Sequence, residues 1–251
     1  MVAIKRFLLM IQFLTTIPLP MQLEVDNKDF GKGLVFAPVI GLMIGGLMGG
    51  CFYLASAIFP LQAAVVITLL AYILLTGGLH LDGLGDTCDG LFSNRSKERM
   101  LEIMRDSRVG TNAVLGIAMV LLLNVSLLWG MDQKLLLKVL ILFPVAGRIG
   151  SIIGAGISEY ARKGEGLGKS FIDYCGIKEV LIGLVFYFGI FYGVKGVVGL
   201  VEGIIPVIMA FLSTRFFTRK IDGATGDILG AVCELNQTFY LLGTFLVGAV
   251  L

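Results

Sequence analysis

The stretch GLVFAPVIGLMIGGLMGGCFYLASAIFPLQAAVVITLLAYILLTGGLHL, residues 33–81, decides the fold of this protein. It contains no Lys, Arg, Asp or Glu, and Pro60 stands near its middle. A helix that crosses a membrane needs about 20 mostly apolar residues. The stretch therefore predicts two membrane-spanning helices, over 33–59 and 62–81, joined by a tight hairpin at Pro60.

The same apolar character continues along the whole chain. Its 251 residues are 57% hydrophobic and 15% charged, whereas soluble domains carry about 25% charged residues. We therefore predict an all-α, polytopic transmembrane helix bundle that forms a single integral membrane domain over residues 1–251. Beyond the first two spans, five more are predicted, which makes about seven: 109–130, 135–157, 178–194, 196–217 and 228–250. A second tight hairpin is predicted near Lys195 and Gly196, between the spans 178–194 and 196–217.

The N-terminal segment has basic residues, Lys5 and Arg6, followed by the apolar run FLLMIQFLTTIPLP. This pattern resembles a signal peptide, but the segment lacks a small-residue cleavage site, and Pro18 and Pro20 stand at the end of the apolar run. We predict a short interfacial helix that lies on or dips into the bilayer and is kept in the mature protein.

The distribution of basic residues predicts an orientation. If residues 1–32 are inside, 16 of the 20 Lys and Arg fall in inside segments, whereas three fall outside and Arg148 lies within a span. This bias follows the positive-inside rule, so we expect a cytoplasmic N-terminus and an external C-terminus. A net charge of +2 gives no reason to expect a nucleic-acid partner. The four cysteines are far apart, which argues against a disulfide framework or a zinc site.

The segment TGGLHLDGLGDTCDGLFSNR, residues 76–95, carries the strongest chemical signal. Asp82, Asp86 and Asp89 are spaced i, i+4 and i+7, so they share one face of a helix. Mg²⁺ is the cation that suits such carboxylates together with substrate phosphates. A solvated acidic face is the alternative, but ionisable groups that directly extend an apolar span are usually functional. His80 is expected on the opposite face of this helix. Two readings stay open: His80 orients another group or contacts a phosphate, or it has no role.

Three further motifs are predicted on the same side. MLEIMRDSRVGTN, residues 100–112, places arginines before a helix start, where phosphates bind well. EYARKGEGLGKSF, residues 159–171, is a glycine-rich basic loop suited to a phosphate or nucleotide. KIDGATGDILGAVCE, residues 220–234, opens the last span, and its Asp227 either caps that helix or joins the metal site, with Glu234 on the same face.

Arg148 lies too deep in its span to be a topology charge, so it needs an acidic partner or a phosphate. Together the carboxylates, arginines and glycines form the set of groups that phosphoryl transfer uses. The residues alone therefore predict a membrane-embedded phosphotransferase that acts on a diphosphate.

These four motifs, in this order and spacing, resemble the cobalamin (5′-phosphate) synthases, also called adenosylcobinamide-GDP ribazoletransferases. The resemblance runs from TTIPLP near the N-terminus to the last span. It implies a Mg²⁺-dependent, multi-pass enzyme that joins adenosylcobinamide-GDP to α-ribazole, or to its 5′-phosphate, and releases GMP late in cobalamin assembly. The resemblance also implies a place in the cytoplasmic (inner) membrane. Whether the enzyme forms a homo-oligomer stays open.

The resemblance also implies roles for individual residues. Asp82, Asp86 and Asp89 are expected to be catalytic, and these three with Asp227 are expected to hold the metal. One carboxylate, with Asp89 or Asp86 favoured, would accept the proton of the attacking hydroxyl. The residues expected to bind substrate are His80, Arg105, Asp106, Arg108, Arg148, Arg162, Glu165, Thr225 and Gly226. Asn236 and Gln237 depart from the family pattern and receive no catalytic role.

Two alternatives remain at this level. The first is a CDP-alcohol phosphotransferase of phospholipid synthesis, because Asp86, Asp89 and Gly90 match the beginning of its motif. Ser93 and Asn94 then replace the expected Ala-Arg. The second is an ion-coupled membrane transporter that uses the aspartates as a relay, and it predicts acidic residues at mid-bilayer on several helices.

Overall fold

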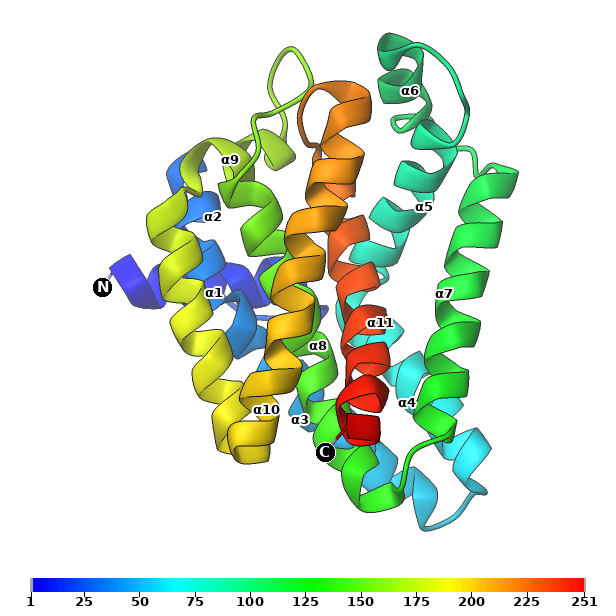
Figure 1. Ribbon diagram of the computed structural model, residues 1–251. Coiled ribbons are helices and arrows are strands. Elements are labelled where there is room, and N and C mark those ends of the chain that lie inside the picture. Colours follow the sequence, from blue (N-terminus) through cyan, green and yellow to red (C-terminus); the bar gives the residue numbers. More distant parts are fainter. Residues whose placement is uncertain (1, 251) are drawn as a thin grey trace.

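The computed structural model describes residues 2–250 and is built from helices (Figure 1). Within those residues there is no β-strand, only one isolated bridge between Tyr160 and Ala224. The predicted all-α fold is therefore confirmed. The helices are α1 (Val2–Leu14), α2 (Asn27–Gly33), the 3-10 turn η1 (Leu34–Phe36), α3 (Ala37–Ser56), α4 (Leu61–Thr76), α5 (Leu79–Leu91), α6 (Lys97–Ile103), α7 (Thr111–Trp129), α8 (Gln133–Gly156), α9 (Leu167–Tyr174), α10 (Ile177–Ile221) and α11 (Gly226–Val250).

The long helices run up and down a bundle in which α8 is central, packed against α3, α10 and α11 (Figure 1). Its residues from Leu142 to Ala155 are all buried, as expected of a helix that is apolar on every side. Glycine allows the closest approach: a Cβ added at Gly45 of α3 would lie within 2.9 Å of three backbone atoms of Ile141 in α8. The loops beside α6 and α9 gather at one end of the bundle, at the top of Figure 1.

The chain is a membrane protein, since several of its helices are long and apolar enough to cross a bilayer. Four qualify by length and composition, and the bent pair of α4 and α5 makes five if it counts as one span. That count treats α10 as one helix, although α10 folds back on itself at Gly196. It leaves α11 out, because Glu234, Asn236 and Gln237 lower the mean hydropathy of that helix. The number of seven crossings, like the single domain, stays a prediction.

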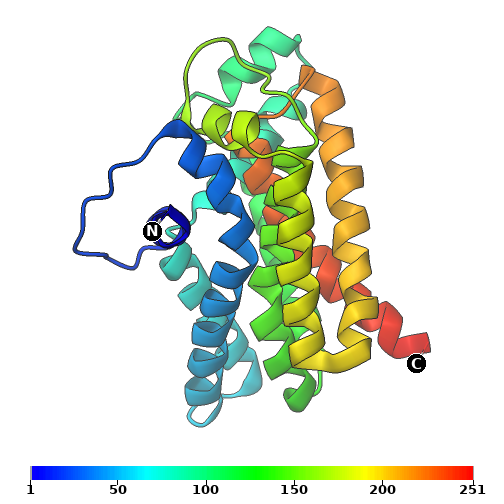
Figure 2. The same ribbon diagram turned by 90° about the vertical axis from the view of Figure 1, so that its left-hand side faces the viewer.

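Both predicted hairpins are present. Pro60 stands between α3 and α4, directly before the first residue of α4. Within α10 the non-helical backbone of Gly196 (φ 61°, ψ −143°) separates two antiparallel halves, which Figure 2 shows side by side. The ion pair between Lys195 and Glu202, with both side chains buried, ties the two halves together at this turn.

The prediction of one continuous helix over 62–81 is wrong. The helix ends at Thr76, and α5 leaves at 90° to α4. The cause is local: Gly77 and Gly78 have φ values of +63° and +68°, in the left-handed region that only glycine adopts readily. This bend sends the aspartate-bearing helix toward the end of the bundle that holds α6 and α9.

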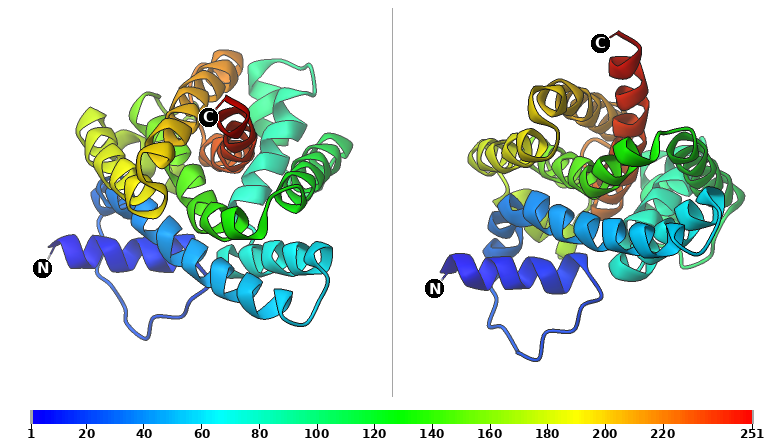
Figure 3. Two further views of the ribbon diagram at one scale, coloured as in Figure 1. Left: turned by 60° about the horizontal axis from the view of Figure 1, so that its bottom comes forward. Right: turned by 90° about the horizontal axis from the view of Figure 1, so that it is seen from below.

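The N-terminal segment forms the predicted short helix, α1, which lies across the bundle rather than along it (Figures 2 and 3). Lys5 and Arg6 pair with the buried carboxylate of Asp29 in α2. After the helix, the backbone N–H of Thr16 donates to the carbonyl of Leu75 at 2.8 Å. These bonds fix α1 beside the bend between α4 and α5, although its depth in a bilayer stays a prediction.

Candidate active site

The three aspartates of the first motif lie on one regular helix, as their spacing predicts. All three belong to α5, where Asp82 is exposed and Asp86 and Asp89 are partly buried. Within residues 2–250, the carboxylates of Asp82 and Asp86 make no hydrogen bond or ion pair. Two unbonded carboxylates one turn apart are available to a ligand that carries positive charge.

Asp89 differs from the other two because both of its oxygens are already bonded. The backbone N–H of Gly110 donates to Oδ2 at 2.6 Å, and that of Ala113 donates to Oδ1 at 2.9 Å. Asp89 therefore caps the N-terminus of α7, where a carboxylate is favoured by the free amides and the helix dipole. A Cβ at Gly110 would lie 2.5 Å from this carboxylate, which explains the glycine of the second motif.

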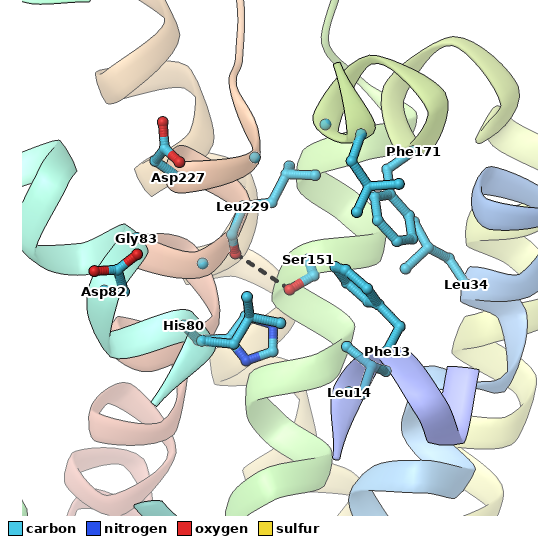
Figure 4. Close-up of a pocket in the computed structure, with 15 residues that line it drawn as sticks. Phe13, Leu14, Leu34, His80, Asp82, Gly83, Ser151, Phe171, Asp227 and Leu229 are labelled. Carbon is cyan, nitrogen blue, oxygen red and sulfur yellow. Dashed lines mark hydrogen bonds between the residues drawn. The ribbon is translucent and has the colours of Figure 1, made fainter. Parts of the chain in front are cut away.

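The fourth motif reaches the same place from α11. A Cβ at Gly83 of α5 would lie 2.8 Å from the carbonyl oxygen of Asp227, so the two backbones touch. Asp82 and Asp227 consequently line one cavity (Figure 4). The sequence predicted this pairing of carboxylates from two helices, and the structure brings the two residues together.

Asp227 does not cap α11, so that alternative is wrong. The backbone N–H of Ile228 instead donates to the hydroxyl of Thr225 at 3.3 Å, which makes Thr225 the capping residue. The Asp227 Oδ2 atom accepts bonds from Arg162 at 2.8 Å and from the Thr225 hydroxyl at 3.2 Å. Asp227 thus faces the site, held there by an arginine of the third motif.

The loop of the third motif, residues 159–171, is held against the turn of the fourth motif that precedes α11. The Ala224 N–H donates to the carbonyl of Glu159, and the Ala161 N–H donates back to the carbonyl of Ala224. Gly168 packs directly on the backbone of Gly226. This contact holds Arg162 beside Asp227, whereas Glu165 is exposed at the far side of the loop.

The arginines of the second motif separate into two environments. Arg105 lines a cavity of about 450 Å³, which we call the basic cavity. Its charged lining has four cationic side chains and two anionic ones: Lys97, Arg105, Arg162 and Lys163, and Glu98 and Glu102. Arg108 is bonded to Asp106 through two nitrogens and points to solvent. Hydrogen bonds from Arg108 hold the pKa of the Asp106 carboxyl at about 2. The structure thus brings Arg105 and Arg162 together but leaves Arg108 and Asp106 paired with each other.

A second polar cluster lies deeper in the bundle, around Arg148. Arg148 is fully buried, and its Nη1 lies 3.4 Å from the Tyr72 hydroxyl and 3.1 Å from the Cys233 sulfur. The Tyr72 hydroxyl donates to Glu234 Oε1 at 2.6 Å, and Gln237 Nε2 donates to Oε2 at 2.9 Å. Among residues 2–250 Arg148 therefore makes no direct ion pair, and its side chain is fully buried. Its predicted contact with a substrate stays a prediction. Glu234 belongs to this cluster and does not join Asp227.

His80 lies between the two clusters. It is buried, and its Nδ1 atom has no hydrogen-bond partner. Ligand atoms of His80, Cys233 and Glu234 lie within 4.8 Å of one another, a spacing that would suit a metal ion. The bond from Arg148 to Cys233 and the two bonds to Glu234 already use these groups, and a cation there would face a guanidinium. The oxygen donors of Asp82, Asp86 and Asp227 fit Mg²⁺ better.

Sequence reasoning missed three members of the deeper cluster, namely Tyr72, Cys233 and Gln237. Each lies inside an apolar span, where a polar side chain must find a partner within the protein. That requirement is the signal in the sequence that points to these three residues, as it does to Arg148.

Comparison with known proteins adds an independent finding. A model of the cobalamin-5-phosphate synthase family matches residues 6–245. An adenosylcobinamide-GDP ribazoletransferase of Clostridium acetobutylicum is 56% identical over 97% of this chain and 96% of the relative. One from Acetivibrio thermocellus is 57% identical over 95% and 96%, and one from Alkaliphilus oremlandii is 42% identical over 98% and 99%. No solved structure matches the chain.

Proposed function

The chain belongs to the cobalamin-5-phosphate synthase family, and on that premise we propose that it is an adenosylcobinamide-GDP ribazoletransferase. It transfers the adenosylcobinamide phosphate group to α-ribazole, or to its 5′-phosphate, in the final assembly of cobalamin. One observation of the structure supports this most: the unbonded carboxylates of Asp82 and Asp86 lie at the end of the bundle where Arg162 pairs with Asp227.

The reaction is a displacement at phosphorus. A ribose hydroxyl oxygen of the ribazole forms a bond to the phosphorus that carries the adenosylcobinamide. The bond from that phosphorus to the bridging oxygen breaks, and GMP leaves with this oxygen. The hydroxyl proton passes to a carboxylate and then to water. In such a reaction the protein mainly positions the groups and stabilises charge.

Mg²⁺, when bound, would neutralise the charge on the diphosphate oxygens. Asp82 and Asp86 would hold it, with Asp227 contributing from α11, because Asp82 and Asp227 line one cavity where α5 and α11 touch, and Asp86 follows Asp82 one turn along α5. Asp89 is left to position α7, since both of its oxygens accept backbone N–H groups. Its predicted role as a ligand stays a prediction.

Each remaining group has a place in this scheme. Asp86 or Asp82 is better placed than Asp89 to accept the hydroxyl proton, because neither carboxylate is bonded. Arg162 and Arg105 line the basic cavity of about 450 Å³, and they would neutralise the GMP phosphate as it leaves. The bilayer would hold the site end of the bundle at the cytoplasmic face of the inner membrane, where basic loops are favoured.

The test is product analysis with purified protein in lipid or detergent. Incubation with adenosylcobinamide-GDP, α-ribazole and Mg²⁺ is expected to yield adenosylcobalamin and one GMP per turnover. Chelation of divalent metal is expected to stop GMP release, and added Mg²⁺ to restore it. Metal-independent turnover would contradict the metal assignment and leave the reaction standing.

Two other outcomes would contradict the reaction itself. Release of CMP from a CDP-alcohol, with no GMP from the corrinoid substrate, would identify a phospholipid enzyme. Ion flux across proteoliposomes without any GMP formation would identify a transporter. A protein that carries Asp82→Asn is the matched control for background hydrolysis of the diphosphate.

A further inference from the structure

A cavity of about 230 Å³ opens between α1, α5, α8, α9 and α11 (Figure 4). Its two sides differ in chemistry. Phe13, Leu14, Leu34 and Phe171 form an apolar side, and the rings of Phe13 and Phe171 lie 4.7 Å apart. Such a surface suits a flat, uncharged ring.

The opposite side of this cavity is polar. His80, Asp82 and Asp227 line it, and Figure 4 shows all three across from Phe13 and Phe171. His80 is buried, and its Nδ1 has no partner, so it is free to form a hydrogen bond with a bound molecule. The cavity therefore fits a molecule with an apolar ring at one end and a hydroxyl at the other.

The basic cavity and the apolar cavity meet at the pair between Arg162 and Asp227. Arg162 lines the basic cavity, whereas Asp227 lines the apolar one, and their ion pair of 2.8 Å joins the two walls. In phosphoryl transfer the attacking and leaving oxygens stand roughly in line on opposite sides of the phosphorus. If the charged leaving group lies in the basic cavity, the apolar cavity is left for the nucleophile.

We propose that this apolar cavity binds the benzimidazole ring of α-ribazole and presents its ribose hydroxyl to the carboxylates of Asp82 and Asp227. The proposal rests on the proposed function. The ring is flat, uncharged and bicyclic, and a cavity of about 230 Å³ is smaller than the roughly 300–1,000 Å³ typical of sites for larger ligands. The corrinoid is much larger than this space and must remain outside it.

Leu79 offers a direct test because it lines the cavity and is 39% exposed, so a larger side chain there need not disturb the core. Leu79→Trp narrows the cavity. We expect the KM for α-ribazole to rise by about tenfold or more, the scale at which pocket size discriminates ligands. The KM for adenosylcobinamide-GDP should change by less than about twofold. Equilibrium dialysis with α-ribazole alone should show the same loss of affinity.

The matched control is Leu122→Trp, the same exchange at a 63% exposed position of α7 that does not line the cavity. It should leave both KM values unchanged. As a second variant, Phe13→Ala widens the cavity, and it should weaken α-ribazole binding while admitting analogues with a bulkier base.

The outcomes separate this proposal from the proposed function. If wild-type protein releases GMP but Leu79→Trp and Phe13→Ala leave the KM and affinity for α-ribazole unchanged, the cavity proposal fails and the function stands. A selective rise in the KM for the corrinoid substrate would also overturn it, because the cavity would then hold that substrate. If wild-type protein releases no GMP, the proposed function itself fails.

Discussion

Two polar clusters share α11 and differ in how their side chains are bonded. The outer one adds residues of α5 and of the loop after α8, and the inner one adds residues of α4 and α8. In the outer cluster, Asp82 and Asp86 have carboxylates without partners, and Asp227 is held by Arg162. In the inner cluster around Arg148, Tyr72 and Gln237 both donate to Glu234. The outer cluster is open to a ligand, whereas in the inner one the carboxylate is bonded within the protein. Arg148 Nε, Arg148 Nη2 and Gln237 Oε1 are buried there without a hydrogen-bond partner among residues 2–250.

We assign ligand binding to the outer cluster and the positioning of helices to the inner cluster. Polar groups in a membrane interior must be satisfied by other parts of the protein. The inner cluster meets much of this need through its own side chains, so it joins α4, α8 and α11 behind the site. The outer carboxylates are like charges close to one another, so a cation bound between them would be favourable. Mutations in the two clusters should therefore affect different measurements.

The largest effect is expected for Asp82→Asn and Asp86→Asn. Each substitution removes a carboxylate that we propose as a metal ligand, so turnover should fall by about 10⁴-fold, which corresponds to about 5.5 kcal/mol of transition-state stabilisation. The rate of GMP release measures this, and the melting temperature should be unchanged. Asp132→Asn is the control, since Asp132 is an exposed residue at the start of α8, where Asn caps a helix equally well. Full activity in either site variant would remove the basis for calling the outer cluster catalytic.

The next effect concerns stability. Glu234→Leu leaves Arg148 charged and buried, which should lower the free energy of unfolding by about 3 kcal/mol. The double variant Glu234→Leu, Arg148→Met should be more stable than Glu234→Leu alone. Thermal unfolding in detergent measures both. If the single and double variants unfold at the same temperature, the charges of Glu234 and Arg148 do not interact, and Glu234 does not stabilise the buried guanidinium.

A smaller effect is expected for Asp89, which tests whether it belongs to the open cluster. Asp89→Ala removes the cap of α7 and should cost about 1 kcal/mol of stability. Asp89→Asn keeps an acceptor oxygen and should cost less. Turnover of Asp89→Asn should fall by less than about tenfold. A loss as large as that of Asp86→Asn would show that Asp89 also acts on the metal or the substrate.

The smallest effect is expected for Asp106, outside both clusters. Its pKa of about 2 lies below the ordinary value, because Arg108 donates hydrogen bonds to it. A lowered pKa in the folded state stabilises the fold above the ordinary pKa, and this contribution is lost as the pH falls toward 2. The small difference in melting temperature between wild type and Asp106→Asn should therefore be constant from pH 5 to 8 and shrink below pH 4. A difference that varies between pH 6 and 8 would contradict this account.

Much of the fold followed from local patterns in the sequence. Apolar runs of sufficient length predicted the helices, Pro60 and Gly196 predicted the hairpins, and the i, i+4, i+7 spacing placed three aspartates on one helix. The family resemblance, confirmed by the comparisons, named the reaction. These inferences succeed because the length of an apolar run and the period of a helix depend only on neighbouring residues.

Only the tertiary structure decided which of these side chains are free. The 90° bend at Gly77 and Gly78 sets the direction of α5, and the contact of Gly83 with Asp227 joins two helices far apart in sequence. Asp89 matches Asp82 and Asp86 in spacing, yet α7 takes both of its oxygens. The bond from Tyr72 to Glu234 spans 162 residues. Whether a carboxylate is available to a ligand depends on its long-range partners, and no local pattern records them.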